Sequence, residues 1–278
     1  MKAHCLRIVT AGLLAAAVAG CAGGSAPPAP AASAGVGSPR DPTSQHWPGG
    51  PPERTAAAPK APRPDVSGTW RHPGGPGGAS LRPAEGFPIT PWAAERMKSE
   101  KPTFSNDFRE TTDPAVLYAD PNGYPRIQMH PMKFKLVQTD DYVYHLWEYN
   151  QNWRQIAMNK EHSPDAPATW YGNAVGKWDG DTLVVDSTGY KASTWLTSQG
   201  LPHTEDLHIV ERIRRDGDTL VMHFTFEDPG AFTKPWSAEL KYERVEDGAM
   251  IETIFTISDE LRFRERFLGV PSPIPIRR

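Results

Sequence analysis

Residues 207–226, LHIVERIRRDGDTLVMHFTF, contain two runs rich in β-branched, aliphatic and aromatic residues on either side of Asp216-Gly217-Asp218. Asp-Gly between such runs predicts an antiparallel hairpin, because glycine takes the positive φ angle that the turn requires. The same motif recurs at Asp179-Gly180-Asp181, before Thr182–Val185, and at Glu246-Asp247-Gly248, between Lys234–Tyr242 and Met250–Ile257. The repeated turns predict sequential antiparallel pairing.

Working outward, Phe134–Gln138 and Tyr142–Tyr149 form another expected hairpin, and further strands are expected around Trp70, Trp153 and Trp170. The total of roughly eight to ten strands favours an up-and-down barrel over a small sandwich. One short helix is expected from Thr90 to Lys98, with a threonine N-cap followed by Pro91. The sequence therefore predicts an all-β, lipocalin-like antiparallel barrel with one or two short helices, over residues 65–278.

The chain before this domain has a different composition. Residues 22–64 are mostly Ala, Pro, Gly and Ser, and their only larger apolar side chains are Val36 and Trp47. Such a stretch cannot bury enough surface to offset its ordering entropy, so a disordered tether is expected. Residues 1–20 have a basic start, an apolar run and small residues before Cys21, which is the layout of a secretory signal peptide.

Val18-Ala19-Gly20-Cys21 resembles the bacterial lipobox. The resemblance implies cleavage before Cys21 and lipidation of its thiol, and two or more acyl chains on one residue give a stable membrane anchor. Ala22 in place of Asp implies sorting to the outer membrane. We therefore expect a lipoprotein of the cell envelope that faces the periplasm, with the membrane as its partner through the lipid anchor.

Charge and motifs exclude several classes. The chain has 30 basic and 33 acidic residues, and removal of Lys2 and Arg7 changes its net charge from −3 to −5, so no nucleic-acid partner is expected. There is no P-loop, nucleophile elbow, dinucleotide fingerprint or H-E-x-x-H motif, so neither a cofactor nor a metal is expected. Glu161, His162 and Asp165 offer at best a loose cation site.

The domain also resembles a large group of exported bacterial proteins known mostly as hypothetical proteins. The resemblance covers most of the chain from about residue 65, and it is specific in order and spacing. It is carried by PITPWAAER (88–96), LVQT (136–139), EYN (148–150), VGKWDGDTLVVD (175–186) and DPGAFTKPW (228–236). It implies no established activity. Asn173-Ala174 stands where His-Ser is usual, and a cysteine-containing segment before Pro125-Arg126 is missing.

The candidate ligand-binding residues are polar and aromatic groups of the barrel. Glu148 and Arg154 end one strand and begin the next, so as a pair they could orient the polar head of a ligand; the alternative is a salt bridge at the rim. Glu211 and Arg212 point to opposite faces, so at most one faces the lumen. Both are candidates, and the remaining candidates are Trp170, Asn173, Trp195 and Trp236.

His203 lies in a loop just before a strand and, with Glu148, forms the candidate acid-base pair. The alternative is an exposed loop histidine. Three functions remain open: a protein that binds a small amphipathic or aromatic molecule in the barrel, a cofactor-independent lyase, hydratase or isomerase with His203 and Glu148 as catalytic residues, and an envelope scaffold. A filled core is as compatible with the pattern as a cavity.

Overall fold

The computed structural model describes residues 64–73, 80–103, 108–246 and 248–254, with a few isolated residues beyond. These lie in one compact unit, Lys60–Arg278. The predicted signal peptide, the lipidation site Cys21 and the predicted tether up to residue 63 lie outside the described residues. None of the described helices has the length and apolar character needed to span a bilayer.

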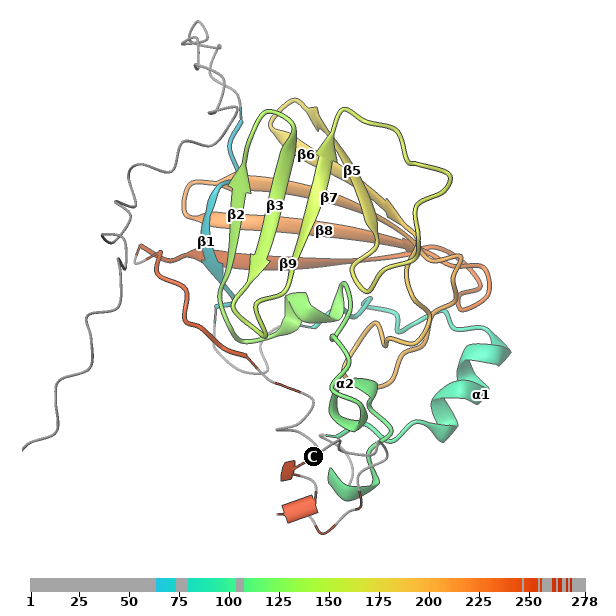
Figure 1. Cartoon of the computed structure of the whole chain (residues 1–278). Coiled ribbons are helices and arrows are strands. Elements are labelled where there is room, and N and C mark those ends of the chain that lie inside the picture. The colour runs from blue at the N-terminus through green and yellow to red at the C-terminus, as the bar shows by residue number, and fades with distance from the viewer. Residues whose placement is uncertain are drawn as a thin grey trace, which may run out of the picture. The chain divides into compact units, whose positions relative to one another are not determined.

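The described domain is a closed barrel of nine strands, which confirms the all-β prediction (Figure 1). In chain order they are β1 (Gly68–Arg71), β2 (Phe134–Gln138), β3 (Tyr142–Trp147), β4 (Trp153–Met158), β5 (Asn173–Asp179), β6 (Thr182–Thr188), β7 (His208–Asp216), β8 (Thr219–Glu227) and β9 (Trp236–Arg244). The helical elements are α1 (Pro91–Ser99), α2 (Pro114–Leu117) and the 3₁₀ helices η2 (Phe108–Glu110) and η3 (Arg126–Met129).

The strands follow their sequence order around the barrel, and all neighbours are antiparallel except β4 and β5, which are parallel. A closed ring of purely antiparallel neighbours needs an even number of strands, so a barrel of nine must contain a parallel pair. Residues 159–172 form the crossover that this pair requires. Trp170, expected on a strand of its own, lies in this crossover segment.

Two of the predicted Asp-Gly turns are present, with Gly180 at φ 61° and Gly217 at φ 60°. The third prediction is wrong, because β9 ends at Arg244 and pairs with β1, where Trp70 lies opposite Arg244. Since β1 occupies that edge, no edge remains for a strand after the turn. Residues 250–254 form no strand, and only Thr253 makes an isolated bridge, to Tyr149.

The helices gather at one end of the barrel, together with the β6–β7 and β8–β9 connections (Figure 1). As predicted, Thr90 caps α1, and its hydroxyl accepts from Ala93 N at 3.2 Å and donates to Gly230 O at 2.8 Å. The segment that follows α2 leads into η3, whose Ile127 and Gln128 are buried and close the barrel mouth.

Strand alternation explains the filling of the barrel. Inward positions of every strand carry buried side chains, including Leu136, Val143, Ile156, Leu183, Ile209, Ile213, Leu220, Met222, Phe224, Leu240 and Tyr242. The apolar packing is interrupted by polar side chains at inward positions, which form the first candidate site.

Candidate functional site

Five residues form a polar cluster inside the barrel, which we call the interior cluster: Tyr124, His145, Arg154, Tyr190 and Glu211. All are at most 4% exposed. His145 on β3 and Arg154 on β4 are register partners, and Glu211 comes from β7. Alternation directs all three side chains inward.

Arg154 and Glu211 form the charged centre of the interior cluster. Arg154 Nη2 donates to both carboxylate oxygens of Glu211, at 2.7 and 2.8 Å. The Tyr124 hydroxyl donates to Glu211 Oε2 at 2.5 Å, and the Tyr124 ring lies 3.7 Å from the Arg154 guanidinium carbon. Burial opposes the charge of Arg154, but Glu211 holds the pKa of Arg154 above its usual value. Burial also raises the pKa of Tyr124 well above its usual value, so its hydroxyl remains a donor.

The expected pair of Glu148 and Arg154 is not formed. Because His145 lies opposite Arg154, Glu148 falls in the turn beyond β3, outside the lumen. Its oxygens accept from Ile251 N at 2.7 Å and from Lys133 N at 3.2 Å, and Lys133 Nζ lies 3.2 Å away. Glu148 therefore ties the β3–β4 turn to the segment that follows β9. Its ion pair is with Lys133 and not with Arg154, so the rim salt bridge expected as the alternative is not formed either.

Glu211 and Arg212 point to opposite faces, as expected. Glu211 is fully buried, whereas Arg212 lies outside and pairs with Asp179 at 2.9 Å. The other predicted ligand-binding residues are dispersed. Trp236 is stacked on Phe226 in the core, Trp170 lies under Lys191, Asn173 donates to Pro167 O at 2.9 Å, and Trp195 reaches a hollow outside the barrel.

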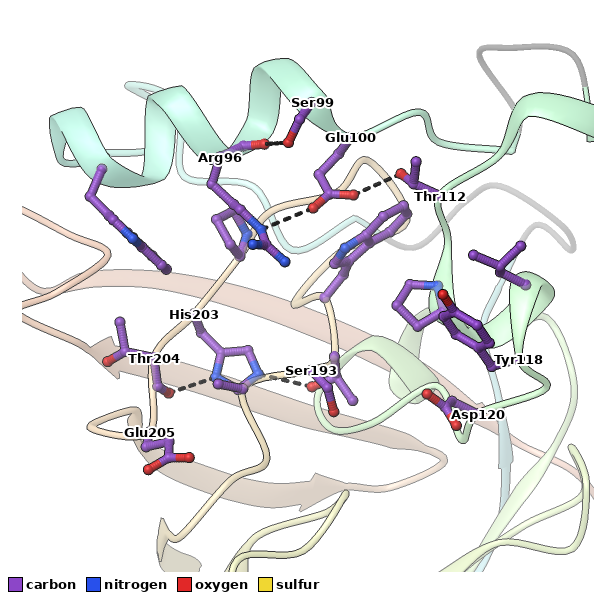
Figure 2. Close-up of a pocket in the computed structure, with 17 residues that line it drawn as sticks. Arg96, Ser99, Glu100, Thr112, Tyr118, Asp120, Ser193, His203, Thr204 and Glu205 are labelled. Carbon is purple, nitrogen blue, oxygen red and sulfur yellow. Dashed lines mark hydrogen bonds and ion pairs between the residues drawn. The ribbon is translucent and has the colours of Figure 1, made fainter. Parts of the chain in front are cut away.

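That hollow, the cap groove, is the second candidate site. It lies between α1, α2 and the β6–β7 connection and has a volume of about 750 Å³ (Figure 2). Its apolar wall includes Trp92, Leu117, Tyr118, Trp195 and Pro202, and its polar wall includes Arg96, Glu100, Asp120, His203, Thr204 and Glu205.

The polar groups of the cap groove are partly paired. Arg96 Nε lies 3.1 Å from Glu100 Oε1, and Glu100 Oε2 accepts from the Thr112 hydroxyl at 2.7 Å (Figure 2). Burial raises the pKa of Asp120, while the charge of Lys191 acts in the opposite direction. Trp92 and Tyr118 are 47% and 42% exposed, so their rings are accessible for contact with a ligand.

His203 lies in the wall of the cap groove, but it is 1% exposed, so it is not the exposed loop histidine of the alternative prediction. Its Nδ1 lies 2.8 Å from Thr204 O, which can only accept, so Nδ1 carries the proton. Nε2 lies 2.8 Å from the Thr194 hydroxyl, whose hydrogen it shares with Lys191 O at 3.2 Å. Burial lowers the pKa of His203, although Thr204 O and Asp228 oppose this. Among the described residues no hydrogen bond or ion pair joins His203 to Glu148.

The cap groove and the interior cluster are separated by a thin wall. The Tyr190 ring lies edge-on to His203, with centroids 6.4 Å apart. Gly123, next to Tyr124, lies so close to Thr194 that an added Cβ would come within 2.7 Å of the threonine methyl group. Tyr124 and Tyr190 therefore lie on the barrel side of this wall, and His203 and Thr194 lie on its groove side.

Several residues of these sites were not predicted. The alternation of β3 places His145 on the same face as Val143 and Trp147, and this was the available signal for His145. Tyr124, Tyr190 and Trp92 come from connections and a short helix, where no periodicity indicates the direction of a side chain. No group of three or more His, Cys, Asp or Glu side chains that could hold a metal ion occurs in the described part of the chain.

The comparisons with known proteins add no assignment, since neither a protein-family model nor a curated protein matches the chain.

Proposed function

We propose that the protein binds a small amphipathic or aromatic molecule in the cap groove while a lipid on Cys21 tethers it to the outer membrane. The observation that carries the proposal is the groove itself, in which accessible Trp92 and Tyr118 rings lie beside Arg96, Asp120 and Glu205. Small-molecule sites commonly occupy about 300–1,000 Å³ and combine an apolar wall with a few polar groups.

The groove suits such a ligand better than the barrel lumen. The inward side chains of the nine strands are buried and packed together, so the lumen leaves room for a small group at most. A flat ring can stack on Trp92 or Tyr118, and a polar end can reach Asp120 or Glu205 without losing all of its water. The tether follows from the signal-like N-terminus, which remains an inference from sequence.

A titration with N-phenyl-1-naphthylamine, a neutral aromatic fluorophore, tests the proposal on the full chain. We expect fluorescence enhancement on binding, and Trp92→Ala should weaken the Kd about tenfold because a large contact ring is lost. The matched control is Trp153→Ala, since Trp153 is 54% exposed and lines a separate hollow of about 320 Å³.

The control should bind the fluorophore as the unchanged chain does. If Trp153→Ala weakens binding and Trp92→Ala does not, the cap groove is not the site. Absence of enhancement with every variant would contradict binding of aromatic molecules altogether.

A further inference from the structure

Several buried side-chain atoms have no hydrogen-bond partner among the described residues, and four of them lie on two facing residues: Nδ1 and Nε2 of His145, and Nε and Nη1 of Arg154. His145 is 0% exposed and Arg154 is 4% exposed. A buried polar atom without a partner loses its hydration with no compensation, and native proteins leave few such atoms. Because the four atoms lie on two facing residues, we expect these residues to share a bound partner.

Neither side chain can turn away to find another partner. The His145 ring is stacked on Trp147, with centroids 4.0 Å apart, and packs against the tilted ring of Phe134 at 4.7 Å. Arg154 is fixed by Glu211 and by the ring of Tyr124. Because the two residues are register partners, their side chains are neighbours on the inward face of the barrel.

Charge limits what this place can accept. The charges of Arg154 and Glu211 cancel, and burial together with Arg154 lowers the pKa of His145 well below its usual value, which keeps that ring neutral. An added anion would leave an uncompensated charge in the closed core, which is strongly unfavourable. The two ring nitrogens of His145 lie on opposite edges of the ring, so a single oxygen contacts only one of them. A neutral hydroxyl, with one donor and two acceptor positions, can accept from Arg154 and donate to the unprotonated nitrogen of His145.

We propose that the interior cluster is a second binding site, independent of the cap groove, which holds a neutral oxygen-bearing group against Arg154 and His145. The group is the hydroxyl of a small organic molecule, or a trapped water. Both sources share the same hydrogen-bonding chemistry, and a buried water also needs two to four polar partners.

Nitrogen-15 NMR of the His145 imidazole in the full chain tests the proposal directly. A ring nitrogen without a proton resonates further upfield when it accepts a hydrogen bond. We expect the upfield-shifted signal for His145. A signal at the position of a free, unbonded nitrogen would overturn the proposal.

The stability of His145→Phe provides a second readout, since phenylalanine preserves the stacking but removes both nitrogens. If a group is bound, the variant removes its hydrogen bond to His145 and weakens its hold on Arg154, so the Tm should fall by about 3–6 °C. Without a bound group, removal of two unpaired nitrogens should raise the Tm, which would contradict the proposal. His223→Phe on β8, outside the core, is the control for the exchange of residue type.

Native mass spectrometry of the full chain distinguishes the two sources. A reproducible excess mass that is lost on denaturation and absent from His145→Phe identifies an organic molecule. The bare chain mass, together with the upfield nitrogen signal, identifies trapped water. We expect Trp92→Ala to leave the His145 signal unchanged, because the interior site does not depend on the cap groove.

Discussion

At the scale of single residues, Asp186 on β6 joins two histidines that come from separate parts of the chain. His162 Nε2 lies 2.8 Å from Asp186 Oδ1, and His208 Nε2 lies 3.0 Å from Oδ2. His162 was a candidate for a loose cation site with Glu161 and Asp165. Instead, it fastens the crossover segment to the barrel wall.

We expect Asp186→Asn to lower the Tm at about pH 6, with a difference from the unchanged chain that disappears as the pH falls well below 3.8. Burial alone would raise the pKa of Asp186, but its hydrogen bonds with His162 and His208 hold that pKa below 3.8 in the folded state. A carboxylate with a depressed pKa contributes stability above its unfolded pKa, and this stability is lost as it becomes protonated in the folded state. Thermal unfolding over a pH series measures the effect. A difference in Tm that is constant over the series would contradict it.

At the scale of elements, the crossover between β4 and β5 is the connection on which the closed barrel depends. Its last residue, Gly172, has φ 71°, and an added Cβ would lie 2.5 Å from the Tyr190 ring. Gly180, in the β5–β6 turn, has φ 61° but open space around its Cβ position. The two glycines share a backbone conformation and differ in crowding.

We therefore expect Gly172→Ala to reduce the free energy of unfolding by about 3 kcal/mol and Gly180→Ala by only about 1 kcal/mol. The loss in Gly180→Ala reflects only the cost of a left-handed backbone at alanine. The larger loss in Gly172→Ala adds the cost of displacing Tyr190. Urea denaturation of both variants makes the comparison. Equal losses would show that the crossover is not tightly packed against Tyr190.

Elements whose sequence signals come from neighbouring residues are predicted correctly. Elements that depend on closure of the barrel are missed. The Thr90 cap and the Asp-Gly turns at Gly180 and Gly217 depend on neighbouring residues, and each is present. The strand expected at Met250–Ile257 is absent over its described residues 250–254, because β1 takes the edge of β9, which is a contact between distant segments. The partner of Arg154 is likewise Glu211, 57 residues away, and not the nearby Glu148.

At the scale of the whole molecule, the proposed binding groove and the proposed lipid anchor are separate parts of one chain. The segment 22–64 lies between Cys21 and the described domain. Binding in the groove itself should not require the anchor, because the groove is lined only by residues 92–205.

We therefore expect Cys21→Ser to transfer the protein from the membrane fraction to the soluble periplasmic fraction, with the Kd for N-phenyl-1-naphthylamine unchanged. Serine lacks the thiol that would carry the acyl chains, so the double-chain anchor is lost. Cell fractionation with immunoblotting measures the first effect, and fluorescence titration of the released protein measures the second. Retention in the membrane fraction would contradict lipidation at Cys21. Release with loss of binding would show that the groove needs the membrane surface, so the two outcomes separate the anchor from the binding site.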